Sequence, residues 1–452
     1  MISEADIKKL ADRLSDSSEL TTDLTDFEEY CHDATIDSGQ PVAVVWAASD
    51  DDVIAVVRFC RKHSIPIVPR GAGTGLSGGC VPPPQGGLVL STERMKTLRI
   101  DPEKRIARVG PGVITKELLD EAAKLGLTYP PDPASFDEST LGGNVAENAG
   151  GLRCKRFGVT KDYVLGMRAI SIDGEILHTG IYNSNRGFAL GDLLTGSEGT
   201  LAIITEIALR LIEAPETGVT MLAAFDSPEN AARTVADITG AGQITTVLEY
   251  LDGDAAACSN EYEKQDGLHK VAALLLIELP HNPKATKLVE DCCRINQCSY
   301  IRIETDPTRA EQLWKVRRNL SKATQEIASV RVSEDVAVPI SRFPELVRFV
   351  DEMNRSSSLR INSYGHAGDG NLHVNFLSMT GDEADYRMMD TEIERLLRKA
   401  VSLGGTLSGE HGIGLAKRKY IGFEFDNATL DAMKKLKSCF DPNGLLNPGK
   451  IF

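Results

Sequence analysis

The chain has 452 residues, 42% of them hydrophobic and 25% charged, which is the balance of a folded globular protein and, at ~150 residues per domain, indicates two or three domains. The 50 Lys and Arg side chains against 65 Asp and Glu give a formal net charge of -15, which repels phosphate backbones and argues against a nucleic-acid partner. Nine cysteines without a Cys-x-x-Cys pair, an acidic start and no apolar run near the ~20 residues of a membrane span indicate a cytoplasmic enzyme without disulfides, signal peptide or transmembrane segment.

Strands and helices are expected to alternate along most of the chain. An N-terminal helical segment precedes a strand at 42–46, a helix with an apolar stripe, and a strand at 65–69 that runs into a glycine cluster, which is typical of a β-α-β start. After a predicted linker at 213–218, the pattern is that of an α+β unit. Its strands are expected at 219–225, 244–250, 271–279, 299–304, 330–339, 359–365 and 371–377, and its helices near 227–240, 283–296, 307–327, 341–355 and 382–402.

Three glycine-rich segments lie in the first half, at 69–79, 139–151 and 194–205. The first contains a formal G-x-G-x-x-G, but three prolines soon after it rule out the helix that a Rossmann fingerprint needs, and no Gly-Lys-Ser/Thr closes a P-loop. Such a loop can bring many backbone N–H groups close to an anion. Three segments of this kind in one domain favour binding of a long dinucleotide over a merely flexible loop.

These segments, together with the tail Gly-Leu-Leu-Asn-Pro-Gly at 444–449, resemble the FAD-binding oxidases and dehydrogenases of the vanillyl-alcohol oxidase type, in the branch of glycolate oxidase, D-lactate dehydrogenase and D-2-hydroxyglutarate dehydrogenase. The resemblance covers about residue 40 to the end. It implies an α+β fold, with a two-subdomain, PCMH-type FAD-binding domain, an α+β cap domain for the substrate, and a C-terminal segment that returns to the FAD domain. The implied boundaries are 1–40 for the N-terminal helical segment, 41–215 for the FAD-binding domain, 216–415 for the cap and 416–452 for the C-terminal segment.

The resemblance also implies which residues contact FAD. Because some relatives attach FAD covalently to a histidine of the first loop and this loop has none, the FAD is expected to be bound non-covalently. The implied contacts are Pro69, Arg70, Gly71, Ala72, Gly73, Thr74, Gly75, Ser77, Gly78, Pro131, Asp132, Pro133, Thr140, Leu141, Gly142, Gly143, Asn144, Asn148, Ala149, Gly150, Gly151, Glu198, Ile203, Ile204 and Asn447.

A second group of candidate residues lies in the second half. The Asp-Gly pair at 369–370, between extended flanks, predicts a two-residue hairpin turn in which His366 faces His373. Their Cβ atoms would then be ~5 Å apart, which suits two imidazoles on one metal ion. Glu410 and His411 are adjacent, so in an extended segment they point opposite ways, and one can complete a metal site while the other faces something else. A surface turn or core position is the simpler interpretation of any single histidine, but glycines flank each site and permit close approach.

By resemblance, His366, His373 and Glu410 are the ligands of a zinc- or manganese-like divalent metal ion, and His411 is the catalytic base. Arg317 is the implied clamp for the substrate carboxylate, in keeping with the bidentate geometry of a guanidinium. The implied reaction oxidises a D-2-hydroxy acid to the 2-keto acid: the metal lowers the pKa of the hydroxyl, His411 removes its proton and a hydride passes to flavin N5.

Substrate and partners are less constrained. Ser333 stands where relatives that act on D-2-hydroxyglutarate supply a lysine, which favours D-lactate or glycolate, although Arg331 could replace that cation. The alternatives are a D-2-hydroxyglutarate dehydrogenase, a non-redox FAD-containing ether-lipid synthase of the same superfamily, and a flavin-free metal hydrolase, which leaves the glycine segments without a role. The electron acceptor stays open, as do an iron–sulfur partner subunit, peripheral membrane association through such a partner, and a homodimer.

Overall fold

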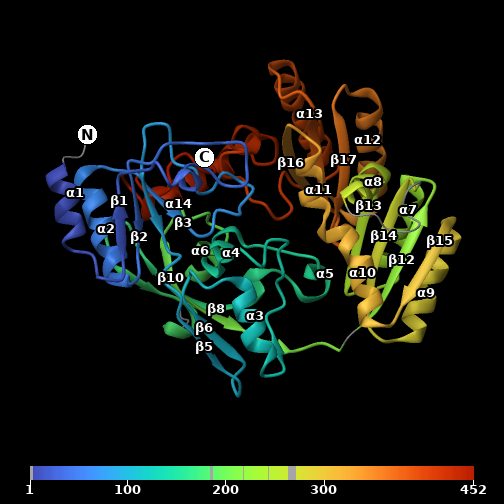
Figure 1. Ribbon diagram of the computed structural model, residues 1–452, viewed down its shortest axis with the longest axis horizontal. Helices are drawn as coiled ribbons and strands as arrows, with labels where there is room; N and C mark the ends of the chain where they lie inside the picture. The colour runs from blue at the N-terminus through green and yellow to red at the C-terminus, as the bar shows by residue number, and fades with distance from the viewer. Residues whose placement is uncertain (1–3, 184–186, 217, 243, 263–270) are drawn as a thin grey trace. The chain divides into compact units, whose positions relative to one another are not determined.

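The structure is a computed structural model that describes every residue except 1–3, 184–186, 217, 243 and 263–270. The chain forms two compact units, each drawn in Figure 1. The first unit consists of Met1–Gly150, Gly158–Ala214 and Glu410–Phe452, and the second of Gly151–Phe157 and Pro215–Gly409. The domain boundaries expected at 41, 216 and 416 remain predictions, since these units are defined by packing alone.

A four-stranded sheet in the order β1-β2-β4-β3 opens the first unit, with β2, β4 and β3 parallel and β1 antiparallel to β2. Helix α2 (Asp50–His63) connects β2 to β3 and buries its stripe of Val53, Val56 and Val57 completely. The Ser49 side chain caps this helix by accepting a hydrogen bond from the N–H of Asp52, which confirms the predicted β-α-β start. The strands are β1 (Glu19–Thr21), β2 (Ala43–Trp46), β3 (Ile67–Arg70) and β4 (Leu88–Ser91).

Among its described residues, the first unit also contains a five-stranded antiparallel sheet in the order β5-β6-β10-β8-β9 and a two-stranded sheet of β11 and β7. Strand β10 is almost entirely buried at the centre of its sheet. The strands are β5 (Leu98–Asp101), β6 (Ile106–Val109), β7 (Leu127–Thr128), β8 (Val164–Ile170), β9 (Ile176–His178), β10 (Ile203–Arg210) and β11 (Ile212–Glu213). The remaining α-helices of this unit are α1 (Glu4–Ala11), α3 (Thr115–Ala123), α4 (Leu141–Glu147), α6 (Leu190–Leu194) and α14 (Asn427–Phe440).

The C-terminal segment packs on the first unit, as predicted. Leu446 forms a parallel bridge with Ile67 of β3, and the N–H of Asn447 donates to the carbonyl oxygen of Ile67 at 2.7 Å. Leu445 and Leu446 are buried in the same apolar core as the valines of α2. Burial of these two leucines stabilises the return of the chain to the unit in which it began.

The second unit is built on a seven-stranded antiparallel sheet in the order β15-β12-β14-β13-β17-β18-β16. This order places β13 next to β17, although a long stretch of sequence separates them, and β17 next to β18. The strands are β12 (Val219–Phe225), β13 (Val247–Asp252), β14 (Ala273–Leu279), β15 (Cys298–Glu304), β16 (Val330–Ala337), β17 (Arg360–Gly365) and β18 (Asn371–Ser378).

Helices cover this sheet. Helices α8, α10 and α11 pack over an apolar layer that includes Leu222, Leu251 and Leu274, while α7 packs against α9 and α12. The stretch expected at 307–327 is two helices, because the chain leaves α10 at Asn319, a weak helix former, before α11 begins. None of the described helices has the length and apolar character that crossing a membrane requires. The helices are α5 (Cys154–Phe157), α7 (Pro228–Gly240), α8 (Gly253–Tyr262), α9 (Pro283–Ile295), α10 (Pro307–Arg318), α11 (Leu320–Glu326), α12 (Phe343–Ser356) and α13 (Glu383–Ser402).

Candidate active site

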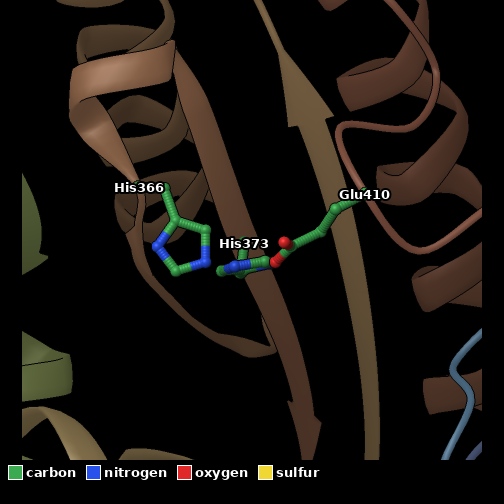
Figure 2. A group of neighbouring side chains, drawn as sticks. All are labelled: His366, His373 and Glu410. Atoms are coloured by element: carbon green, nitrogen blue, oxygen red, sulfur yellow. The ribbon is translucent and has the colours of Figure 1, made fainter. Parts of the chain in front are cut away.

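Two histidines and a glutamate predicted to bind a metal come together. His366, His373 and Glu410 each offer one ligand atom, and these atoms lie within 4.8 Å of one another (Figure 2). His373 is on β18, His366 directly precedes the 3-10 helix η5 (Ala367–Asp369), and Glu410 follows Gly409, the last residue of the second unit. The histidines are buried and Glu410 is partly exposed. Two imidazole nitrogens and a carboxylate oxygen form a donor set that suits zinc or manganese.

The hairpin that carries the histidines differs from the predicted one. In the ladder between β17 and β18, Tyr364 faces His373, so the pairing is shifted by two residues from the expected match of His366 with His373. The turn contains η5 and ends at Gly370, whose φ is 75°. A Cβ atom there would lie 2.0 Å from the carbonyl oxygen of Val338, so the longer turn depends on glycine. The expected direct pairing is therefore wrong, but the turn still places the two imidazole centroids 5.3 Å apart.

The predicted carboxylate clamp, Arg317, is buried on α10 with 6% of its surface exposed. Its Nε donates to Oε2 of Glu249 at 2.5 Å, and its guanidinium carbon lies 4.8 Å from the ring centroid of Tyr364. Glu249 is fully buried on β13, and its Oε1 lies 2.7 Å from Nδ1 of His366. A single buried carboxylate thus contacts both the predicted clamp and a predicted metal ligand.

Glu249 was not among the residues singled out from the sequence. Burial alone would raise the pKa of Glu249, but the charges of His366 and Arg317, with the hydrogen bonds to both, lower it to about 2. The carboxyl group is therefore ionised at neutral pH. The signal available in the sequence is one charge inside the apolar stretch Val-Leu-Glu-Tyr-Leu at 247–251, because a carboxylate in a buried strand needs partners.

The segment that carries the predicted base, His411, is held in the first unit by Glu198. The N–H of Ile413 donates to Oε1 of Glu198 at 2.8 Å, and the N–H of Gly414 donates to Oε2 at 2.7 Å. Glu198 is 6% exposed, and His411 keeps an intermediate exposure. Glu198, predicted as a FAD contact, therefore has both carboxylate oxygens bonded to the protein backbone.

The three glycine-rich segments meet within the first unit. A Cβ atom on Gly71 of the first segment would lie 2.2 Å from Oγ1 of Thr140, the N-cap of α4 in the second. The N–H of Glu198 in the third segment donates to the carbonyl oxygen of Ala146 in α4 at 2.8 Å. Residues 71–87 contain neither helix nor strand, as the prolines predicted. Backbone groups of three segments that are far apart in the sequence thus lie close together.

Polar side chains among the predicted FAD contacts also bind the protein itself. Nη1 of Arg70 donates to the carbonyl oxygen of His32 at 2.6 Å, and Nδ2 of Asn144 donates to Oγ1 of Thr115 at 2.7 Å. The other predicted contacts lie on or beside elements of the first unit, except Gly151, which belongs to the second. They comprise Pro69 on β3, Ala72 to Gly75, Ser77 and Gly78 in the first loop, Pro131, Asp132 and Pro133 after β7, Leu141, Gly142 and Gly143 on α4, Asn148, Ala149 and Gly150 after it, and Ile203 and Ile204 on β10.

Asn447 in the tail joins the first and third glycine-rich segments. Its Nδ2 donates to the carbonyl oxygens of Gly79 at 2.8 Å and Glu198 at 2.7 Å. Its Oδ1 is buried and has no hydrogen-bond partner among the described residues. A buried acceptor of this kind fits a bound group that donates a hydrogen bond.

Comparisons with known proteins bear on both units. Residues 41–180 match the family described as FAD binding domain, and residues 214–451 match the family described as FAD linked oxidases, C-terminal domain. The chain belongs to the FAD-linked oxidases. This oxidase is 37% identical to the glycolate oxidase subunit GlcD of Bacillus subtilis, over 94% of this chain and 92% of that protein. It is 33% identical to the D-lactate dehydrogenase of Anaerostipes hadrus, over 94% and 92% of the two chains, and 35% identical to that of Archaeoglobus fulgidus, over 90% of each.

Solved structures of other proteins share the fold. The likeness to p-cresol methylhydroxylase has a TM-score of 0.80 at 16% identity and covers 100% of this chain and 97% of that one. The likeness to 4-ethylphenol oxidase from Gulosibacter chungangensis has a TM-score of 0.78 at 18% identity, covering 100% and 98%. The predicted α+β fold with a PCMH-type FAD-binding domain and a cap domain is confirmed. The FAD-binding family, the gathered glycine segments and the buried acceptor of Asn447 agree with FAD as the cofactor.

Proposed function

We propose that this FAD-linked oxidase converts a D-2-hydroxy acid, D-lactate or glycolate, into the 2-keto acid. The observation that carries the proposal is that one carboxylate links a possible metal site to a buried arginine. His366 and Arg317 each contact one oxygen of Glu249. His366 also lies beside His373 and Glu410, the other two possible metal ligands. Relatives named glycolate oxidase subunit GlcD and D-lactate dehydrogenase support this substrate class. The match to FAD families excludes the flavin-free hydrolase.

Each side chain then has a defined task. His366, His373 and Glu410 would hold a divalent metal ion, and Arg317 would bind the substrate carboxylate through its guanidinium. His411, adjacent to Glu410 in the chain, would accept the hydroxyl proton, because an imidazole titrates near neutrality. A bound metal ion would lower the pKa of the substrate hydroxyl. Non-covalently bound FAD would accept a hydride, which carries two electrons.

D-2-Hydroxyglutarate is the second candidate substrate. Arg331 and Ser333 alternate on β16, so they share one face of the strand, and β16 pairs with β18, where Asp335 faces His373. Arg331 lies four residues from that pair, ~13 Å along a strand, and Ser333 lies two residues from it. A second carboxylate would therefore need to reach Arg331, because Ser333 offers no positive charge. This difference favours the shorter monocarboxylates.

An electron acceptor is also required. The relatives from Bacillus subtilis and Escherichia coli are named as a subunit of glycolate oxidase, which supports transfer of electrons to a partner chain. An iron–sulfur protein is the chemical class that would accept electrons one at a time from a reduced flavin.

The deciding measurement is the visible absorption spectrum of the purified protein, recorded without oxygen before and after addition of D-lactate, glycolate or D-2-hydroxyglutarate. We expect D-lactate or glycolate to bleach the flavin bands, and chelation of the metal to prevent bleaching. His411→Ala should slow flavin reduction by roughly 10²–10⁴-fold, which is the usual contribution of a general base. His281→Ala, at an exposed position, is the matched control and should reduce at the wild-type rate.

Two outcomes would contradict the proposal. A flavin that stays oxidised with all three acids would point to the non-redox ether-lipid synthase, since alkyldihydroxyacetonephosphate synthase has the same fold at a TM-score of 0.75 and 18% identity. Bleaching that persists in full after removal of the metal would leave the FAD chemistry in place but exclude the metal group from it.

A further inference from the structure

Glu249 is an acidic residue in an otherwise apolar layer of the second unit. Strands β13 and β17 are antiparallel, with Leu251 facing Tyr364. Two steps further in the same register, Glu249 comes to lie opposite His366, just beyond the end of β17, on the same face. Its neighbours on that face of β13, Val247 and Leu251, belong to the apolar core beneath α10. The sheet therefore places the carboxylate of Glu249 between α10 and the turn that joins β17 to β18, which begins at His366.

The two oxygens of this carboxylate have different partners. Oε1 lies 2.7 Å from Nδ1 of His366, and Oε2 accepts from Nε of Arg317 at 2.5 Å. A carboxylate that forms an ion pair with Arg317 only accepts hydrogen bonds, so Nδ1 of His366 carries a hydrogen. In the neutral imidazole, which is the form that binds a metal, the lone pair is then on Nε2. Figure 2 shows the other ring nitrogen of His366 directed toward His373 and Glu410. The contact thus selects the tautomer that a metal ion needs.

Contacts beyond Glu249 close a ring of five side chains. The guanidinium of Arg317 lies 4.8 Å from the ring centroid of Tyr364, whose centroid is 5.7 Å from that of His373. The centroid of His373 is in turn 5.3 Å from that of His366. Since Glu249 binds both His366 and Arg317, a displacement of either one is transmitted to the other.

Glu249 also balances the charge of Arg317. Both side chains are buried, and Oε2 of Glu249 accepts from Nε of Arg317 at 2.5 Å, so without this carboxylate the guanidinium would lose a charged acceptor in a buried environment.

We infer that Glu249 is a positioning residue that holds His366 in its metal-binding tautomer and Arg317 in its carboxylate-binding orientation, so that one buried group couples the metal to the substrate carboxylate. This inference rests on the proposed function, because it takes His366 as a metal ligand and Arg317 as the clamp. It extends that function to a residue that contacts one proposed metal ligand, His366, and the proposed clamp, Arg317.

The test measures Zn²⁺ affinity by competition with a chelating dye, on FAD-loaded protein stripped of metal, for wild type and Glu249→Gln. The amide offers one acceptor oxygen for two donors, so we expect Zn²⁺ affinity to fall about 10–100-fold, as for other partners of metal-bound histidines. The KM for D-lactate should rise as well, because Arg317 binds the carboxylate before and during reaction. Glu249→Asp keeps two acceptor oxygens on a shorter side chain, farther from His366 and Arg317. Its Zn²⁺ affinity should therefore lie between those of Glu249→Gln and wild type.

Glu278→Gln is the control, since Glu278 lies on the neighbouring strand β14 opposite Val247 and pairs with Arg153 at 3.5 Å. It should bind Zn²⁺ as wild type does. Unchanged Zn²⁺ affinity in folded Glu249→Gln would overturn the inference, and if that variant does not fold, unchanged affinity in Glu249→Asp would do so. Failure of the wild-type protein to bind Zn²⁺ would instead contradict the proposed function itself.

Discussion

At the scale of single residues, the pKa of the Glu198 carboxyl group is raised above its ordinary value. Burial raises its pKa to about 7, although the N–H groups of Ile413 and Gly414 and the charges of Lys450 and Lys417 lower it. The carboxyl group that holds the segment next to His411 thus changes charge near neutral pH.

Glu147 lies close to the same backbone. Loss of hydration raises its pKa well above the usual range, and the charges of Glu198 and Asp33 add to this. A Cβ atom on Gly412 would lie 2.7 Å from Oε2 of Glu147 and 2.9 Å from Oε1 of Glu198, so both carboxyl groups crowd this glycine. Ionisation of both would place two negative charges in a confined space.

These raised pKa values predict how stability depends on pH. A carboxyl group with a raised folded-state pKa stabilises the fold fully below its ordinary value of 4.5, and this contribution is lost as the pH rises through the folded-state pKa. Glu147→Gln cannot ionise, so we expect its melting temperature to exceed that of wild type by several degrees at pH 8 and to match it at pH 4.5. Thermal melts at both pH values test this, with the exposed Glu138→Gln as control. An equal difference at both pH values would contradict the role of ionisation.

At the scale of elements, the turn between β17 and β18 depends on Gly370. Its φ of 75° costs a side-chain-bearing residue ~1–2 kcal/mol, and contact of the new Cβ with the carbonyl oxygen of Val338 adds ~1–3 kcal/mol. We expect Gly370→Ala to lower the free energy of unfolding by ~2–5 kcal/mol in chemical denaturation. Zn²⁺ affinity should fall too, because the turn positions His366.

Gly404→Ala provides the matched control for this turn. Gly404 has a φ of 78°, but among the described residues no heavy atom beyond its chain neighbours lies within 4 Å of its would-be Cβ, so the substitution should cost only the ~1–2 kcal/mol of backbone strain. Equal losses in Gly370→Ala and Gly404→Ala would show that contact with Val338 does not hold the turn.

Local patterns suffice to predict some elements and not others. The expected strand at 219–225 is β12, and the expected helix at 227–240 is α7 with Ser227 as its N-cap, because linker, apolar run and capping residue are all local signals. The register of β17 and β18 was missed because the turn is set by contact between Gly370 and Val338, which are distant in sequence. Glu249 was missed for the same reason, since its partners come from other elements.

At the scale of the whole chain, the sequence indicates which segments contribute to each candidate site but not how they are shared between the units. The three glycine-rich segments were recognised together by their composition and family resemblance. Residues 151–157 nevertheless belong to the second unit, where Nζ of Lys155 donates to Oγ1 of Thr239 at 2.9 Å. No local pattern predicts that residues 151–157 belong to the second unit, because this follows from packing between segments far apart in the sequence.

The C-terminal segment closes the first unit through Asn447, whose Nδ2 serves the carbonyl oxygens of Gly79 and Glu198. Asn447→Asp preserves the shape of the side chain but replaces the Nδ2 donor with a second acceptor oxygen. The two carbonyl oxygens then lose this hydrogen-bond donor and lie next to a negative charge. We expect the free energy of unfolding to fall by ~2–4 kcal/mol. FAD content after gel filtration should fall as well, because these carbonyls belong to two of the glycine-rich segments. Asn443→Asp, exposed on the same tail, should keep wild-type FAD content and melting temperature. If Asn447→Asp did so too, the tail would return to the first unit through its leucines alone, without help from this side chain.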